Sequence, residues 1–409
     1  MNSNASPHAT APVSLPPSWR IGARVADLET PCWLVDRPTM RRNLRRMADE
    51  ARAAGVRLRP HVKTHKIPAI AREQLALGAG GIAVAKASEA EVMAMAGIDD
   101  IVVVYQPASD HKRRRLIDLA RSGVAVGCTI EDAGVADALA ADARAAGVGI
   151  DVYLELNIED PSGHQGRTGV TLAAAPALAA HVQALKGLRL RGILGYRGVG
   201  WLYGPEARDY ATGDLQATAD EEARILREAA EAIRATGVPI DEVVAGSTPT
   251  ARLVLAAPGI TEVQPGEYVF YGGTHVGPGV AALEDCAVSI AVTVATVPTP
   301  GRAVIDGGSK VFAGDIKPDM LPNLRMRGLG IVRDPVTRAP LPGVTLAALS
   351  EEHGALRYDP ERITLRVGDR LDVVPVHVCT SVNLAHALVA VEDDRVVDVW
   401  PVAARGHVW

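Results

Sequence analysis

The chain has 409 residues, of which 48% are hydrophobic and 22% are charged, and its formal net charge is −5. These proportions are typical of a globular enzyme, and the mild acidity argues against a nucleic-acid-binding surface. The four cysteines form neither a CxxC pair nor a disulfide-like pattern, which indicates a reduced, cytoplasmic protein. No apolar run approaches the roughly 20 residues that cross a bilayer, so we expect no membrane-spanning segment.

Residues 1–29 begin with a stretch rich in Ser, Ala, Pro and Asn. This stretch lacks the basic start and apolar centre of a signal peptide. We therefore expect a disordered tail, with a possible strand that joins the second domain.

Residues 30–277 alternate short apolar runs with longer amphipathic stretches, which is the pattern of a parallel sheet covered by helices. Helices are predicted at 40–54, 88–96, 135–146 and 220–235. Strands are predicted at 32–35, 57–62, 81–85, 101–105, 124–128, 152–156, 188–194 and 242–245. So many β/α units indicate an α/β fold, a (β/α)8 barrel, with a doubly wound open sheet as the alternative.

Residues 278–409 have a different pattern, with β-like runs, Gly and Pro punctuation, and no long helical stretch. The runs lie at 286–297, 302–305, 363–366, 370–374 and 395–400. This region is predicted to be a mostly antiparallel β domain.

Lys63 is the most informative residue, because it lies in an unusual basic segment at 59–66. Read as a strand, the segment places Arg59, His61 and Lys63 on one face. Such a face is costly to bury unless an anion or solvent meets it. Nearby cations lower a lysine's pKa and suit it to Schiff-base chemistry, although an edge strand with a solvated face would have the same sequence.

Other candidate residues follow predicted barrel strands, where the active site of such a barrel lies. The turn at 246–250 offers hydroxyls and a helix start, which suit a phosphate group, and the segment 265–268 could add backbone N–H groups. A plain helix cap would give the same turn. Besides Lys63, Lys86 and Tyr105 stand at the ends of the predicted strands 81–85 and 101–105. The other candidates are Arg167, Tyr196, Tyr203, Ser247, Thr248, Gly266, Glu267 and Tyr268.

His377 and Cys379 form a second candidate site, in the β domain. On a strand, two residues at this spacing point to the same side, so imidazole and thiolate could share one metal ion. A metal site that leaves coordination positions open for water or substrate would be suited to catalysis. The alternative is that His377 and Cys379 are a buried, purely structural pair. His353 could join the same region.

Six segments occur in one order and carry a family resemblance: 59–66, 166–170, the Tyr196/Tyr203 pair, 246–250, 265–271 and 377–379. Together they resemble the fold-type III pyridoxal-phosphate enzymes of the D-serine dehydratase and D-threonine aldolase group. The resemblance implies an alanine-racemase-like barrel, a metal-carrying β domain and a homodimer. It further implies that Lys63 carries pyridoxal 5'-phosphate, that Arg167 approaches the cofactor's pyridine nitrogen, and that His377 and Cys379 bind a divalent metal, zinc or otherwise Mn²⁺.

The metal pair and the segments 246–250 and 265–271 resemble the dehydratase branch, since the aldolase branch more often has Asp at the position of Cys379. The expected reaction is the dehydration and deamination of D-serine, or a related D-3-hydroxy amino acid, to a keto acid and ammonia. Lys63 would remove the Cα proton, and the metal would assist departure of the β-hydroxyl. Retro-aldol cleavage of the D-threonine aldolase type is the alternative.

Two residues depart from the family pattern: Val376 replaces an Asn and Arg197 replaces a His, so the accepted side chain can differ from that of D-serine. A racemase would need a second base, commonly a tyrosine from the β domain, and Tyr358 is the sole tyrosine beyond residue 280. A non-catalytic pyridoxal-phosphate carrier would resemble the barrel alone. Both are weaker alternatives.

Overall fold

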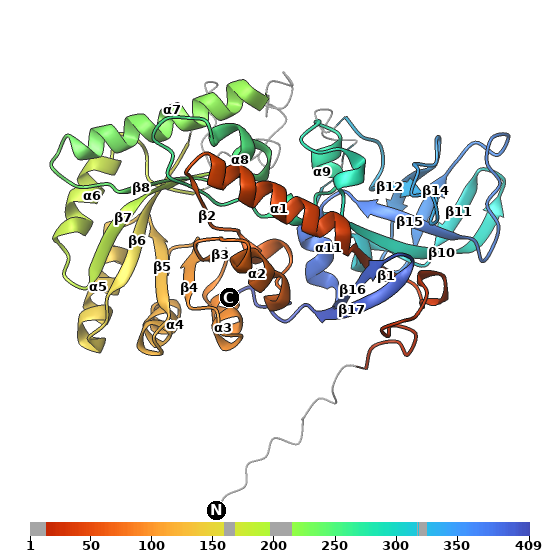
Figure 1. The fold of residues 1–409 in the computed structure, drawn as a ribbon, viewed down its shortest axis with the longest axis horizontal. Helices are drawn as coiled ribbons and strands as arrows, with labels where there is room; N and C mark the ends of the chain where they lie inside the picture. The colour runs from red at the N-terminus through yellow and green to blue at the C-terminus, as the bar shows by residue number, and fades with distance from the viewer. Residues whose placement is uncertain (1–13, 159–167, 197–214, 317, 319–324) are drawn as a thin grey trace, which may run out of the picture.

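The computed structural model describes residues 14–158, 168–196, 215–316, 318 and 325–409. Figure 1 shows a barrel surrounded by helices beside a second body made mostly of strands, with helix α1 (Arg37–Ala53) leading from the second body to the barrel. The predicted order of a parallel α/β barrel followed by a mostly antiparallel β domain is confirmed.

The barrel consists of eight parallel strands in the order β2-β9-β8-β7-β6-β5-β4-β3. The two end strands meet through an isolated bridge between His61 and Ala83, with a hydrogen bond from Ala83 N to Pro60 O of 2.8 Å. The sheet therefore closes on itself. Its strands are β2 (Arg57–Leu58), β3 (Ile82–Val84), β4 (Asp100–Val103), β5 (Ala125–Ile130), β6 (Ile150–Leu156), β7 (Leu188–Gly195), β8 (Glu242–Ala245) and β9 (Glu262–Val263).

The barrel helices form where the sequence supplies caps and an apolar face. In α5 (Ala133–Ala146), the Asp132 side chain accepts a hydrogen bond from Val135 N at 2.9 Å, and Gly147 ends the helix with φ of 67°. All four predicted helices are present. The remaining helices are α2 (Pro68–Ala76), α3 (Ala87–Met95), α4 (Asp110–Arg121), α6 (Ala175–Ala184), α7 (Leu215–Arg234) and α8 (Thr248–Val254).

The assignment of residues 32–35 to the barrel is wrong. Strand β1 (Cys32–Asp36) instead pairs with β10 and β16 in the second sheet, and the barrel is completed by β9, which was not predicted. A fully apolar run suits a buried strand in either sheet, so periodicity could not choose between them. The two-residue β9 is too short to show any periodicity.

The second sheet has nine strands and is antiparallel except for the β1–β16 pair. The strand predicted at 363–366 is absent, because that described segment has no sheet partner, and β12, β13, β14 and β16 were missed. The helices described here, α9 (Gly273–Val276), α10 (Ser309–Phe312) and α11 (Val378–Leu384), are short. Besides β1, the strands are β10 (Val288–Thr299), β11 (Arg302–Ile305), β12 (Gly330–Arg333), β13 (Thr345–Leu349), β14 (Gly354–Arg357), β15 (Arg370–Pro375), β16 (Ala387–Glu392) and β17 (Arg395–Pro401).

The predicted tail is only partly described, and its described part lies against β17. Gly22 N donates to Val396 O at 2.8 Å and Val396 N donates to Ala23 O at 2.9 Å. The expected strand is reduced to a single bridge between Arg24 and Arg395. Residues 14–29 therefore belong to the β domain, and residues 1–13 lie outside the described part of the chain.

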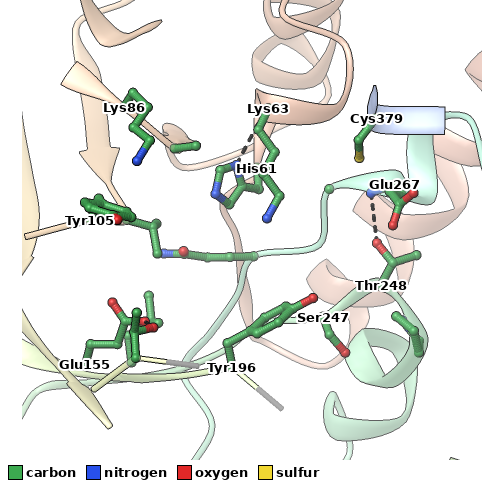
Figure 2. A pocket seen from close by; sticks show the side chains of 18 of the residues that line it. His61, Lys63, Lys86, Tyr105, Glu155, Tyr196, Ser247, Thr248, Glu267 and Cys379 are labelled. Atoms are coloured by element: carbon green, nitrogen blue, oxygen red, sulfur yellow. Dashed lines mark hydrogen bonds between the residues drawn. The ribbon is translucent and has the colours of Figure 1, made fainter. Parts of the chain in front are cut away.

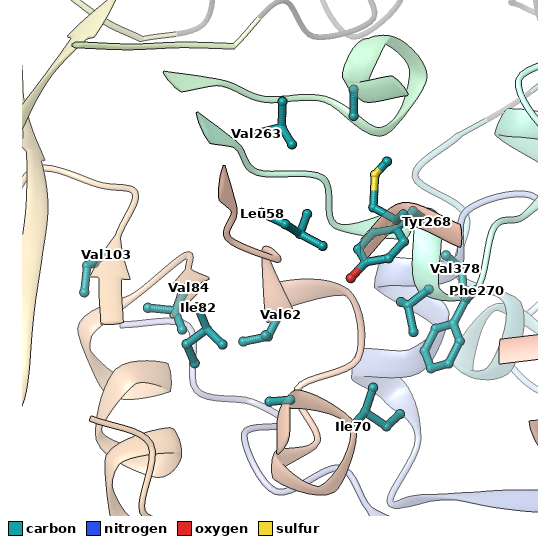
Figure 3. Packing of buried hydrophobic residues seen from close by; sticks show 14 of the residues in the cluster. Leu58, Val62, Ile70, Ile82, Val84, Val103, Val263, Tyr268, Phe270 and Val378 are labelled. Carbon is teal, nitrogen blue, oxygen red and sulfur yellow. The ribbon is translucent and has the colours of Figure 1, made fainter. Parts of the chain in front are cut away.

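The hydrophobic core continues from the barrel into the β domain. Leu58, Val62, Val263, Phe270 and Val378 belong to one buried cluster, and Figure 3 shows Tyr268 between Leu58 of the barrel and Val378 of α11. Each of these side chains is buried. Because α11 carries the predicted metal pair, this packing holds that pair at a fixed place relative to the barrel mouth.

Charged side chains occupy the inside of the barrel. Arg59 is 3% exposed and pairs with Asp100 at 2.5 Å and with Glu262 at 3.2 Å. Burial alone would lower the pKa of Arg59, but these two carboxylates raise it. The carboxylates of Asp100 and Glu262 therefore supply the negative charge that buried Arg59 requires, and no ligand is needed for it.

Candidate active site

The segment around Lys63 is not the strand that its alternation suggested. Strand β2 ends at Leu58, and Val62–Thr64 forms a 3-10 helix whose N-cap, His61, accepts from Lys63 N at 3.4 Å. Pro60 has no N–H to donate to a neighbouring strand, which is a local reason for the ladder to stop. The turn places Lys63 at the barrel mouth, whereas Arg59 points into the barrel.

A cavity of about 620 Å³ lies between the barrel mouth and the β domain, within the usual range for small-molecule sites. Figure 2 shows Lys63 and His61 near its centre, with Lys86 and Tyr105 on one side and Glu267 and Cys379 on the other. The predicted residues that line it are Lys63, Tyr196, Ser247, Thr248, Gly266, Glu267, His377 and Cys379.

One described residue among the predicted positions, Tyr268, does not line this cavity. Tyr268 is buried in the core, where its hydroxyl accepts a hydrogen bond from Gln74 Nε2 at 3.0 Å. Arg167 and Tyr203 lie outside the described residues, as does the departure at Arg197. The other departure, Val376, packs with Ile316 in a small buried cluster.

The segment predicted to hold a phosphate brings the ends of β8 and β9 together. Ser247 precedes α8, and Thr248 Oγ1 accepts a hydrogen bond from Glu267 N at 2.9 Å. A Cβ at Gly266 would lie 2.9 Å from Thr64 Oγ1 and 3.0 Å from His61 O. Glycine is therefore required at Gly266 for the β9 end to approach the Lys63 segment so closely.

His377 and Cys379 are brought together by a helix start and not by a strand. His377 is the N-cap of α11, and Cys379 lies in its first turn. Their side chains form a group with Glu267 in which the potential ligand atoms lie within 4.8 Å of one another. His353 is exposed beside Ser350 and is not part of this group.

Asp315 orients the imidazole of His377. Its Oδ2 lies 2.5 Å from His377 Nδ1, and its Oδ1 accepts from Thr380 Oγ1 at 2.9 Å. His377 Nε2 is thereby left for the cavity, as in metal sites where a carboxylate orients a ligating histidine. Sequence reasoning missed Asp315, and no spacing in the sequence links it to His377.

The charges of His377, Cys379 and Glu267 influence one another's protonation. Burial alone would lower the pKa of His377, but the hydrogen bond with Asp315 and the neighbouring Cys379 raise it well above its usual value. Burial, reinforced by Glu267, raises the pKa of the Cys379 thiol, while His377 and Lys63 oppose that rise. Binding of a cation would favour the thiolate and the neutral imidazole together.

The other walls of the cavity carry further polar residues: Lys86 and Tyr105, which the sequence placed at the ends of barrel strands, and Glu131 and Glu155, which sequence reasoning missed. Lys86 Nζ lies 3.4 Å from the centre of the Tyr105 ring. Glu155 accepts a hydrogen bond from Thr168 Oγ1, and Glu131 accepts one from Gly169 N. Glu131 follows β5 and Glu155 is the last but one residue of β6, and this place at strand ends is the one signal that could have identified them.

A closed parallel barrel with a lysine at its mouth, joined to a β domain with a His/Cys group, is an alanine-racemase-like architecture with an added metal-type site. The sequence matches the family model "Alanine racemase, N-terminal domain" over residues 35–274. It matches the model "Putative serine dehydratase domain" over residues 287–391.

Two curated relatives match over nearly their whole length. D-threo-3-hydroxyaspartate dehydratase of Delftia sp. (strain HT23) is 36% identical over 93% of this chain and 98% of the relative. D-threonine aldolase of Arthrobacter sp. is 32% identical over 96% of this chain and 97% of the relative. A metal-free form of a D-threo-3-hydroxyaspartate dehydratase variant superposes with a TM-score of 0.82 and 33% identity, over 94% of this chain and 100% of that chain.

The chain therefore belongs to the fold-type III pyridoxal-phosphate family that contains these dehydratases and aldolases, and it is a pyridoxal-phosphate-dependent lyase. The predicted resemblance is confirmed. No helix in the described parts of the chain is long and apolar enough to cross a membrane.

Proposed function

We propose that this protein dehydrates D-3-hydroxy amino acids with the help of a divalent metal ion and releases a keto acid and ammonia. The observation that carries the proposal is that Lys63 and the His377/Cys379 pair line one cavity. The dehydratase and aldolase relatives support the substrate class. Among β-hydroxy substrates, 3-hydroxyaspartate and serine are the first candidates.

The cavity fits the cofactor of the family. Lys63 offers the amine that carries it, and Ser247 and Thr248 offer hydroxyls beside the tight turn at Gly266. When bound, pyridoxal 5'-phosphate supplies an electron sink for negative charge at the substrate Cα. Lys63 then serves as the base that takes the Cα proton.

The balance of the reaction explains the need for a cation. The Cα–H and Cβ–O bonds break, Lys63 takes the Cα proton and passes it to the departing hydroxyl, which leaves as water; the resulting enamine takes up water and hydrolyses to the keto acid and ammonia. Hydroxide is a poor leaving group, so a Lewis acid held by His377 and Cys379 would assist its departure. A thiolate with an imidazole favours zinc over harder ions such as Mn²⁺.

Lys86 is the residue we assign to a carboxylate of the substrate. Among the described residues that line the cavity, Lys63 and Lys86 are those with an ammonium group, and Lys63 is needed for the cofactor. Lys86 stands on the side of Lys63 away from Glu267 and Cys379 in Figure 2. A substrate with its hydroxyl at the metal pair can thus present its α-carboxylate to Lys86.

Retro-aldol cleavage to glycine and an aldehyde is the second candidate, because an aldolase relative matches the chain almost as well as the dehydratase does. In that reaction, the metal ion held by His377 and Cys379 would activate the β-hydroxyl for loss of its proton while the Cα–Cβ bond breaks. Cys379 favours dehydration, since the aldolase branch is expected to have Asp there. The resemblance also leads us to propose a homodimer, which light scattering in solution tests.

A substrate panel decides between these reactions. The enzyme loaded with pyridoxal phosphate and zinc is offered D-serine, D-threonine and both D-3-hydroxyaspartate diastereomers, with the L enantiomers as controls, and ammonia, keto acid and aldehyde are measured. We expect equal amounts of ammonia and keto acid from D substrates alone. Formation of glycine and an aldehyde would show that the enzyme catalyses the aldolase reaction instead of dehydration. If the enzyme turns over none of the D-3-hydroxy substrates, the proposal is overturned.

A further inference from the structure

We propose that Glu267 is a third protein ligand of the metal ion, so that the cation joins the barrel to the β domain. The inference rests on the proposed function, because it requires a cation at His377 and Cys379. It assigns to Glu267 a role different from the phosphate-binding role expected from the sequence.

The first support is an unsatisfied carboxylate oxygen. Glu267 Oε1 is buried and has no hydrogen-bond partner among the described residues. It lies 3.8 Å from His377 Nε2, the nitrogen that Asp315 leaves unused. A buried carboxylate oxygen without a partner is costly, and a cation between Glu267, His377 and Cys379 would remove that cost.

The second support is that the rest of Glu267 is held in place. Its backbone N–H donates to Thr248 Oγ1 at 2.9 Å, and its Oε2 lies 3.6 Å from the buried His275 Nε2. His275 Nδ1 is in turn 3.1 Å from Thr274 Oγ1. The backbone of Glu267 is thus held by a hydrogen bond, one carboxylate oxygen lies beside His275, and the other lies beside His377.

Three ligands of this kind suit a catalytic site. One imidazole nitrogen, one thiolate sulfur and one carboxylate oxygen leave at least one position of a four-coordinate zinc ion open for a substrate hydroxyl. Glu267 follows barrel strand β9, whereas His377 and Cys379 begin α11 of the β domain. Figure 2 shows Glu267 and Cys379 close to each other. Metal binding should therefore also stabilise the contact between the two domains.

The test compares metal binding by Glu267→Gln with that of the unchanged protein, both loaded with cofactor and stripped of metal. Zn²⁺ is titrated calorimetrically and Co²⁺ by visible absorbance. We expect Glu267→Gln to weaken Zn²⁺ binding at least about tenfold, to alter the Co²⁺ ligand-field bands, and to keep the thiolate-to-Co²⁺ charge-transfer band. The rise in Tm caused by Zn²⁺ should shrink.

The matched control is Glu155→Gln, which changes a carboxylate in the same cavity that already accepts a hydrogen bond from Thr168. It should keep the Zn²⁺ affinity within about twofold. Should Glu267→Gln fail to fold, Glu267→Asp retains the charge with a shorter reach and is expected to bind Zn²⁺ more weakly than the unchanged protein.

The outcomes distinguish failure of the Glu267 assignment from failure of the proposed function. Unchanged Zn²⁺ affinity and Co²⁺ spectra in Glu267→Gln, or in Glu267→Asp if only that variant folds, would overturn the assignment of Glu267 and leave the metal at His377 and Cys379. If the stripped protein binds no Zn²⁺, or if Cys379→Ala binds it as tightly as the unchanged protein, the metal part of the proposed function fails as well.

Discussion

Thr248→Val isolates one hydroxyl at the proposed phosphate end of the cavity. Valine keeps the shape of threonine but cannot hydrogen-bond. Thr248 is 8% exposed, lines the cavity, and accepts a hydrogen bond from Glu267 N at 2.9 Å. The substitution therefore removes the proposed donor to the cofactor phosphate and also leaves the Glu267 N–H without its partner.

These two losses have different sizes and different readouts. A hydrogen bond to a charged group contributes about 1.5–3 kcal/mol, so cofactor affinity should fall roughly 10- to 150-fold. An unpaired buried N–H should cost about 1–3 kcal/mol of folding free energy. Thr248→Ser restores the hydroxyl and should recover most of both losses.

The assay is a titration of cofactor-free protein with pyridoxal phosphate, followed by absorbance, together with urea denaturation of the same samples. If Thr248→Val binds the cofactor with unchanged affinity, Thr248 does not contact the phosphate. If the variant is less stable to urea but binds the cofactor with unchanged affinity, the Thr248 hydroxyl serves only to accept the hydrogen bond from Glu267 N.

Three further predictions concern Lys63, Lys86 and His65. Lys63→Ala should lose the visible absorbance of the bound cofactor and nearly all turnover; borohydride reduction followed by peptide mapping should place the cofactor on Lys63, and its appearance on Lys66 or Lys86 would refute that. Lys86→Met should raise KM for all D substrates roughly 10- to 100-fold with little change in kcat, by loss of a charge-assisted hydrogen bond. An effect on 3-hydroxyaspartate alone would reassign Lys86 to the distal carboxylate, and no effect would remove it from the site. Burial lowers the pKa of His65 to about 4, so the folded state binds its proton less readily than the unfolded state. Stability from His65 should therefore be lost as pH falls below about 6.5, by about 2 kcal/mol between pH 7 and pH 5, and His65→Gln should flatten this part of the denaturation profile.

The sequence predicted the features that depend on local pattern. Apolar runs separated by amphipathic helices revealed the barrel, because strands buried on both faces are continuously apolar. The rule that active sites lie after barrel strands then placed Lys63, Ser247 and Thr248 at one mouth, and all three line the cavity.

Features that depend on tertiary contacts could not be predicted from the local sequence pattern. Strand β1 pairs with strands far along the chain, and its apolar run suits either sheet. Glu267 and Tyr268 are neighbours in one motif, yet one faces the metal pair and the other the core. Asp315 is ordinary in sequence, and only folding brings it to His377.

The measurement that tests the central claim most directly is ammonia release from D-3-hydroxyaspartate by the cofactor-loaded enzyme before and after chelation. The account predicts that chelation abolishes most of the release while the protein keeps its yellow colour, and that added Zn²⁺ or Mn²⁺ restores it. Full ammonia release by the thoroughly chelated enzyme would contradict metal-assisted dehydration at His377 and Cys379.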